Sequence, residues 1–396
     1  MSAIKYINKM TLSSELLETS PAMPPAKKEQ VATRIIFFIA GFATASWAAL
    51  VPFVKTNTGA NDAMLGLLLL CFGVGALVAM PLTGALAAKF GCRRLMVTST
   101  IGFCLILPLL PAISHVSILI AGLLLFGIGI GLTDCAMNIQ AVIVDKASDK
   151  PIMSGFHGFY SVGGIAGAGA MSAILLLGVS PIAAATIISL FSLLLLLISF
   201  KGFLKYAHAP TGPLLALPKG IVLVIGIVCF AIFLAEGTVL DWSAVFLIEH
   251  HGLKESLGGL GFAAFATTMT LGRLTGDKIV MRVGSARVVF WGGLLACIGF
   301  IIAVLSPYLT IAILGYALVG AGCSNIVPVM FSAIGKQNTM PEALAVPAVS
   351  TLGYLGILAG PAAIGFVAFQ FTLAAALLMI AGLLVIIAFV TKLVRV

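Results

Sequence analysis

The sequence predicts an all-α integral membrane protein with twelve transmembrane helices arranged in two six-helix halves. Of its 396 residues, 61% are hydrophobic and only 9% are charged, whereas about a quarter of the residues of a soluble protein are charged. Several apolar segments reach the length of about 20 residues that a helix needs to cross a bilayer. No segment alternates polar and apolar residues in the way a membrane β-strand does, so helices are the predicted elements.

Some apolar segments are too long for one crossing. Residues 288–335 contain no Asp, Glu, Lys or Arg, and one helix of that length would measure about 70 Å. We therefore expect a reversal at Ser306-Pro307, and the same argument divides two other long segments. The twelve predicted spans are 35–54, 63–88, 95–113, 116–144, 157–178, 181–200, 220–248, 257–281, 288–305, 309–335, 343–368 and 371–391.

Four regions follow from these spans. Residues 1–34 form a polar N-terminal tail, 35–200 the N-terminal six-helix half, 201–219 a proline-bearing linker, and 220–396 the C-terminal six-helix half. The tail and the linker are both predicted to lie in the cytoplasm.

The distribution of Lys and Arg predicts the orientation of the chain. Nineteen of the 22 Lys and Arg residues fall in the segments that share a side with the N-terminus, and only Lys55 and Lys254 fall on the other side. Such an excess marks the cytoplasmic side, so both termini are expected there and the protein in the inner (plasma) membrane. The formal net charge of +9 then reflects topology, and no nucleic-acid partner is expected.

The two halves carry an internal repeat. Shifting the sequence on itself brings Ala88–Arg94 onto Met281–Arg287, and Asp134 onto Asn325. Two halves with the same order of elements indicate a parallel repeat related by an axis along the membrane normal.

The loop between the second and third spans carries the strongest family signal. Its sequence, Gly84-Ala-Leu-Ala-Ala88-Lys-Phe-Gly91-Cys-Arg93-Arg94, resembles the loop signature of the major facilitator superfamily, a family of secondary transporters. In the second half the signature is echoed by Gly272-Arg273-Leu-Thr-Gly-Asp277, followed by Arg282.

The resemblance implies that these loops latch the two halves together in the outward-open state. The predicted latch residues are Gly84, Gly91, Arg93, Arg94, Arg273, Asp277 and Arg282. The acid that the family carries in the first copy is Ala88 here, so we expect the latch to depend on the second copy.

Within the superfamily, the chain is most similar to the fucose-permease-like branch. The similar segments are the first span, Asp134–Asn138 in the fourth span and Ser324–Ser332 in the tenth. The resemblance implies alternating-access transport of a small solute, with a sugar or a related metabolite as the expected substrate.

Two acids are the leading candidates for the transport pathway. An ionised side chain in mid-bilayer costs about 2.5–3.5 kcal/mol and usually faces a cavity. Asp134 lies in the fourth span with Asn138 one turn later, and Glu236 lies near the middle of the seventh span. A carboxyl group in a partly dry cavity can take up and release protons near neutral pH. The alternative is a structural carboxylate bonded to neighbouring helices, and Asp241 is expected to be an interfacial anchor.

Three further residues complete the candidate pathway. His157 opens the fifth span and Asn325 is the repeat mate of Asp134, so either can bond a polar solute. The acid of the branch's first span falls on Ala48, beside Trp47, and an aromatic ring there suits stacking on a sugar or an apolar ligand. A structural role remains the alternative for His157.

The remaining motifs point away from catalysis. The sequence has no phosphate-cradling G-x-x-x-x-G-K-[ST] loop, no Ser/His/Asp set and no metal-ligand cluster, so we expect neither an enzyme nor a cofactor or metal. A proton-coupled secondary transporter, acting as a monomer, is the expected function. An exporter of drugs or metabolites, and a non-transporting receptor or assembly protein, are the alternatives.

Overall fold

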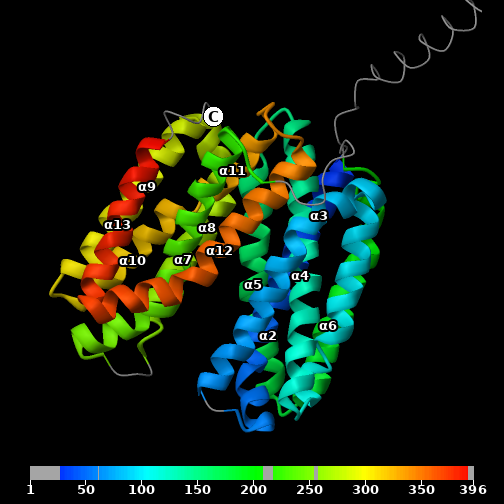
Figure 1. Cartoon of the computed structure of the whole chain (residues 1–396), viewed down its shortest axis with the longest axis horizontal. Coiled ribbons are helices and arrows are strands. Elements are labelled where there is room, and N and C mark those ends of the chain that lie inside the picture. Colours follow the sequence, from blue (N-terminus) through cyan, green and yellow to red (C-terminus); the bar gives the residue numbers. More distant parts are fainter. Residues whose placement is uncertain (1–26, 61, 208–216, 254–256, 391–396) are drawn as a thin grey trace, which may run out of the picture.

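The computed structural model describes residues 27–60, 62–207, 217–253 and 257–390, and these residues form helices with no strand. Figure 1 shows two helical bundles side by side, one built from α2 to α6 and the other from α7 to α13. The elements are α2 (Lys27–Thr58), α3 (Asp62–Ile106), the short η1 (Leu110–Ala112), α4 (Val116–Lys146), α5 (Met153–Leu176), α6 (Pro181–Ser199), η2 (Phe200–Gly202), α7 (Ile221–His251), α8 (Leu260–Val283), α9 (Ser285–Leu305), α10 (Leu309–Cys323), α11 (Ile326–Ile334), α12 (Glu342–Gln370) and α13 (Leu373–Val390).

These bounds match the predicted spans closely, with two exceptions. The described part of α2 begins at Lys27, so residues 27–34 of the predicted tail are helical, while residues 1–26 lie outside the described residues. The predicted tenth span is divided into α10 and α11 at Ser324 and Asn325, a break that the sequence did not reveal.

Glycines end the second and eighth predicted spans at equivalent places. Gly91 has φ 77° and ψ 158°, so α3 is two helices joined at this residue. Gly284, with φ 87° and ψ 146°, separates α8 from α9. Residues with a Cβ rarely adopt such positive φ values. The matching positions of the two glycines show in three dimensions the repeat seen in the sequence.

Small residues bring α2 and α5 into close contact. A Cβ atom at Gly163 or Gly167 would overlap the backbone carbonyl oxygen of Phe38 or Phe42, and one at Gly41 would overlap that of Tyr160. Glycine therefore allows these backbones to touch, as in other membrane helix pairs.

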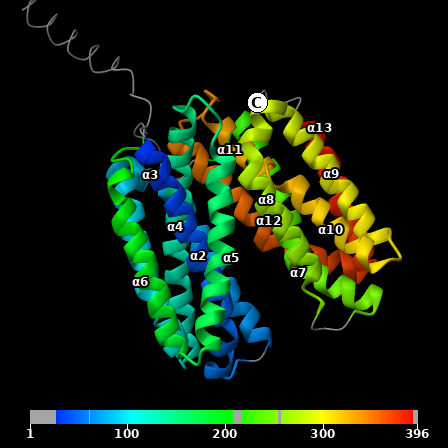
Figure 2. The ribbon, with the colours of Figure 1, turned by 180° about the vertical axis from the view of Figure 1, so that it is seen from behind.

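One end of the molecule is rich in basic residues, and we call it the basic end. Around it lie Lys89, Arg94, Lys146, Lys278 and Lys336, at the ends of their helices. Figures 1 and 2 show that the two bundles come together at this end and diverge toward the other.

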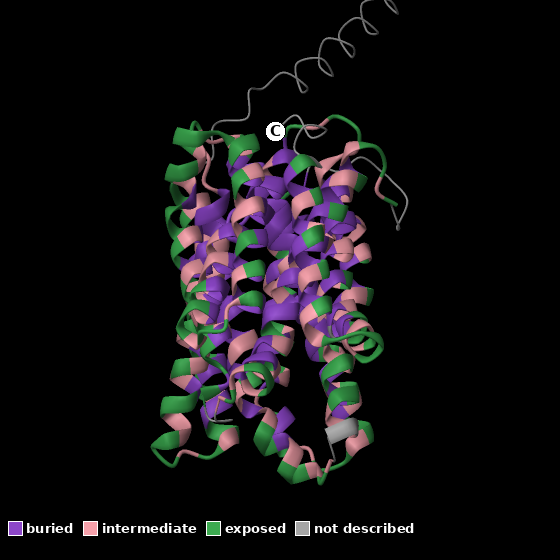
Figure 3. Cartoon of the chain, turned by 90° about the vertical axis from the view of Figure 1, so that its left-hand side faces the viewer, coloured by how far each residue is buried: buried purple, intermediate pink, exposed green. Residues whose placement is uncertain are grey.

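Nine of the helices in the described residues are long and apolar enough to cross a membrane. Buried residues concentrate between the helices, whereas exposed ones cover the outside (Figure 3), and many exposed residues, such as Leu105 and Leu197, are large and apolar. An apolar outer surface of this kind suits contact with lipid. The predicted class, an all-α multi-pass membrane protein, is confirmed.

Candidate functional site: a polar cavity between the two halves

A cavity of about 140 Å³ lies where the two bundles face each other. It brings together Asp134, Asn138 and His157 of the N-terminal half and Glu236 of the C-terminal half, four of the six residues predicted for the pathway. The remaining lining residues are Phe37, Met137, Tyr160, Phe233, Arg273, Phe331, Ser350, Tyr354 and Ile357.

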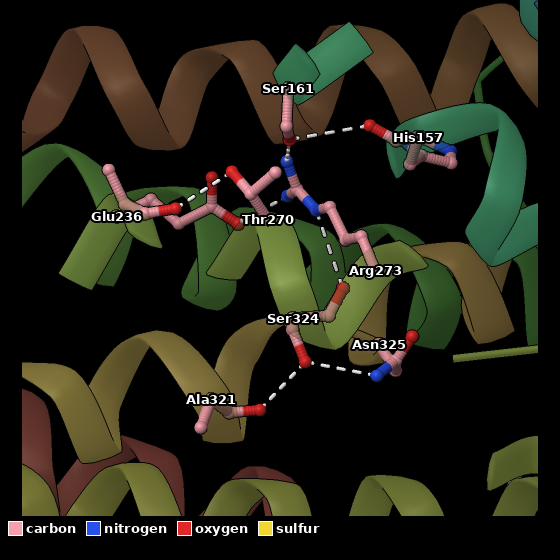
Figure 4. A network of polar contacts seen from close by, with 9 residues as sticks. His157, Ser161, Glu236, Thr270, Arg273, Ala321, Ser324 and Asn325 are labelled. Carbon is pink, nitrogen blue, oxygen red and sulfur yellow. Dashed lines mark hydrogen bonds and ion pairs between the residues drawn. The ribbon is translucent and has the colours of Figure 1, made fainter. Parts of the chain in front are cut away.

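Arg273 organises the polar side of this cavity. Its Nη2 lies 3.1 Å from Oε1 of Glu236, and its Nη1 donates to Oγ of Ser161 over 3.1 Å. Its Nε donates to the carbonyl oxygen of Ser324 over 3.4 Å. Figure 4 shows the guanidinium held between these groups. Because Ser161 belongs to α5 and Arg273 to α8, one of these bonds joins the two halves at the level of the cavity.

The position of Arg273 in the cavity lining was not predicted. The sequence echo of the loop signature assigned it to the latch, but it lies ten residues before the end of α8, and its side chain lines the cavity. The argument that selected Glu236, a charge in the middle of an apolar span, applies equally to Arg273, so the sequence did carry the signal.

Asp134 has a different environment. In the described residues no side chain forms an ion pair or a hydrogen bond with its carboxylate; Asn138 donates instead to its backbone carbonyl, over 2.9 Å. An ionised carboxylate without a partner is costly to hold away from water. Glu236 is paired with Arg273, so Asp134 is the cavity acid that has no cationic partner among the described residues.

Three polar groups of the cavity lining also lack partners. Oδ1 of Asn138, Nε2 of His157 and Oγ of Ser350 are buried and form no hydrogen bond with any residue that the structure describes. Leaving such an atom unsatisfied costs about 1–3 kcal/mol. The His157 ring packs against those of Phe37 and Phe331, with centroids 5.3 and 5.6 Å apart. The cavity therefore combines unused hydrogen-bonding groups with aromatic walls.

The other two predicted pathway residues do not line the cavity. Trp47 is 4% exposed and packs against Phe126 inside the N-terminal half. Asn325 lies at the break between α10 and α11, where its Nδ2 donates to the carbonyl oxygen of Gly272 and to Oγ of Ser324. Asn325 therefore supports the segment that holds Arg273 and does not face the cavity itself.

Asp277, the acid in the second copy of the loop signature, forms hydrogen bonds that link the two halves. Asp277 of α8 accepts hydrogen bonds from the backbone N–H of Gly155, in the first turn of α5, at 3.1 and 3.2 Å. A carboxylate at a helix N-terminus is favoured by the helix dipole. The backbone of Gly84 lies close to α12 of the other half. A Cβ atom at Gly84 would overlap the carbonyl oxygen of Ala343.

Arg93, Arg94 and Arg282, the other basic residues predicted for the latch, form no hydrogen bond between the two halves among the described residues. Arg93 donates to the start of the linker, to the carbonyl oxygens of Phe203 and Lys201 at 2.9 and 2.7 Å. Gly91 packs its backbone against that of Lys205. Arg94 and Arg282 are exposed.

Two contacts between the halves at the basic end were not predicted. Nζ of Lys146, at the end of α4, lies 2.5 Å from Oε1 of Glu342, at the start of α12. Asp145 accepts a short hydrogen bond from Ser332 of α11. A charged hollow of about 440 Å³ lies beside these contacts and shares no lining residue with the Asp134 cavity. These contacts were missed because pairing between distant helix ends leaves no local pattern in the sequence.

The family follows from direct comparison. The sequence profile of the Major Facilitator Superfamily matches residues 35–278. The chain belongs to this superfamily. It is 51% identical to an MFS-type transporter of Yersinia pestis over 348 residues. This match covers 88% of the present chain and 91% of the Yersinia protein. The predicted membership of the major facilitator superfamily is thus confirmed.

Solved structures show the same fold at low sequence identity. The E. coli fucose:proton symporter FucP superposes with a TM-score of 0.74 at 16% identity, covering 91% of this chain and 97% of that one. The proton:xylose symporter XylE superposes with a TM-score of 0.75 at 13% identity, covering 93% and 95%. The fold similarity to a fucose permease agrees with the resemblance found in the sequence.

Proposed function

We propose that this superfamily member is a secondary transporter that moves a small polar solute across the inner membrane by alternating access. In the proposed topology the chain crosses the membrane twelve times: α3 forms two spans, and α10 and α11 together form one. The basic end faces the cytoplasm under the positive-inside rule, and with it both chain termini. The bonds between the halves then close the cytoplasmic side, which corresponds to an outward-facing state.

The observation that carries the proposal is the composition of the central cavity. It lies between two halves of a repeat, which is where transporters of this type place their solute. Its lining offers an unpaired carboxylate, a guanidinium and three polar groups without partners. A polar solute can satisfy those groups, and it would contact both halves at once.

Arg273 gives a physical link between solute binding and movement of the halves. Its hydrogen bond to Ser161 crosses from α8 to α5. A solute oxygen that competes for the guanidinium would weaken this bond and free one half from the other. The Glu236 carboxylate keeps Arg273 oriented while the bond is exchanged, because it holds a different nitrogen.

Asp134 is the proposed proton carrier, assisted by Glu236. A proton that enters from the outside neutralises the unpaired carboxylate, which lowers the cost of closing the cavity around it. Release to the cytoplasm then restores the charge. Each proton that falls through 100 mV provides about 2.3 kcal/mol, which supports roughly fifty-fold accumulation of the solute.

The size of the cavity favours a small metabolite. A volume of 140 Å³ is smaller than the roughly 300–1,000 Å³ of the pockets that hold drug-sized ligands. A sugar or related metabolite therefore suits the site better than a large drug, which weakens the exporter alternative. FucP is a fucose:proton symporter and XylE is a proton:xylose symporter. Their similarity in fold supports the proposal of a sugar-sized solute and of coupling to protons.

The test begins with a thermal-shift screen of the purified protein against neutral sugars, sugar acids and other small metabolites. A stabilising compound is then offered to proteoliposomes under an imposed pH gradient. The proposal expects uptake that follows the gradient and stops with a protonophore. Binding without flux would favour a receptor, and resistance of cells to toxic compounds without uptake of any metabolite would favour an exporter.

A further inference from the structure

A second hollow lies away from the transport cavity, at the basic end of the N-terminal half. It measures about 670 Å³ and lies between the break in α3 and the segment that follows η2. Lys89, Arg93, Arg94 and Lys205 line it, and its lining contains no acid. The hollow is therefore a concentrated positive site.

Two segments that are far apart in the sequence, residues 88–94 and 205–207, form this site. The positive φ of Gly91 reverses α3 and brings the residues before and after the break together. Arg93 then fixes residues 201–204 across the break, through the bonds from its guanidinium and a 2.7 Å bond from its backbone N–H to the carbonyl oxygen of Leu204. This brings Lys205 into the hollow, while Lys89 and Arg94 stay exposed beside it.

An apolar groove adjoins the positive site. A hollow of about 660 Å³ shares Phe90, Arg93 and Arg94 with it and is otherwise lined mainly by apolar side chains, among them Leu86 and Phe200. Phe90, at the junction, is 40% exposed. One continuous surface thus runs from a cluster of cations to an apolar groove on the outer face of the bundle.

We propose that the two hollows bind one anionic phospholipid, with its phosphate among Lys89, Arg94 and Lys205 and an acyl chain along the groove. Basic pockets on the cytoplasmic side of membrane proteins attract anionic headgroups. The apolar groove selects a lipid over free phosphate, because only a lipid can fill both parts. The bound lipid would join α3 to the first residues of the linker between the halves.

The repeat supplies a matched control. The double variant Lys89→Gln/Arg94→Gln removes two cations from the positive site. The variant Lys278→Gln/Arg287→Gln removes two exposed cations from the equivalent region of the C-terminal half. Both lower the net charge of the basic end equally, so general attraction to an anionic membrane falls by the same amount in each.

The experiment is native mass spectrometry of the purified protein titrated with dioleoylphosphatidylglycerol, dioleoylphosphatidylcholine or inorganic phosphate. The wild type is expected to bind the anionic lipid more tightly than the zwitterionic one. Loss of two cations should weaken that binding about 25-fold, at roughly fivefold for each charge, and the control variant should bind as the wild type does.

Three results would overturn the proposal. They are equal binding of the two lipids by the wild type, equal weakening in both double variants, and phosphate binding as tight as lipid binding. The comparison of lipids needs only the wild-type protein, so the proposal can be refuted even if a variant fails to fold.

Discussion

Removal of the Arg273 guanidinium should destabilise the protein more than the loss of its hydrogen bonds alone. The side chains of Arg273 and Glu236 are only 10% and 17% exposed. In an Arg273→Gln variant, the Glu236 carboxylate would stay buried with no cation in contact. Removing one partner of a buried pair costs about 3–5 kcal/mol, and the access of these groups to the cavity places the expected loss near 3 kcal/mol.

The double variant Glu236→Gln/Arg273→Gln should recover part of that loss, because two neutral amides can bond each other where the ion pair stood. We expect a coupling free energy of about 1–3 kcal/mol from the double-mutant cycle. Unfolding by SDS in mixed micelles, followed by circular dichroism, measures each variant. Asp241→Asn is the matched control, since Asp241 lies on the same helix and is exposed, and it should change stability by less than about 0.5 kcal/mol. Additive effects of the two single substitutions would refute the ion-pair account.

Other predictions concern the contacts between the helices. Asp277→Asn should weaken the bond to Gly155 and populate a form open at the basic end, seen as longer spin-label distances between cysteines placed at 150 and 336. An unchanged distance distribution would contradict the latch. Lys146→Gln and Glu342→Gln should each cost only about 0.2–1 kcal/mol, since Lys146 is 56% exposed and exposed pairs contribute little. Gly163→Ala should lower the melting temperature by forcing α5 away from α2. Gly169→Ala should not, because no atom lies within 4 Å of a Cβ there.

The fold was largely predictable because lipid imposes a simple rule. A chain in a bilayer must satisfy its backbone within helices, so long uncharged segments and the Lys and Arg between them define the spans. Gly91 and Gly284 were visible as a repeat in the sequence, and both prove to be the turning points of their helices. The break at Ser324 and Asn325 was not predicted although Gly322 and Pro328 flank it, because glycine and proline also occur inside continuous transmembrane helices.

The site was only partly predictable. Asp134, Asn138, His157 and Glu236 were found because polar groups stand out in apolar spans, and the structure brings all four to one cavity. Trp47 was misplaced because helical position alone does not say which neighbour an aromatic ring meets. It turns toward Phe126 instead of the other half.

The position of Arg273 in the cavity was missed for another reason. A motif match drew attention to its neighbours in sequence, whereas its partners Glu236 and Ser161 lie on two other helices. Ser350 and Tyr354 were missed as lining residues because a hydroxyl in a span full of small residues has no charge to mark it. Such residues become recognisable only when tertiary packing is known.

One measurement tests the central claim most directly. Proteoliposomes containing wild-type protein or Asp134→Asn are given a solute found in the screen, and solute exchange and pH-driven accumulation are measured side by side. If Asp134 carries the proton in the cavity between the halves, the variant will exchange solute across the membrane but will not accumulate it against its gradient. Accumulation by Asp134→Asn equal to that of the wild type would contradict the account.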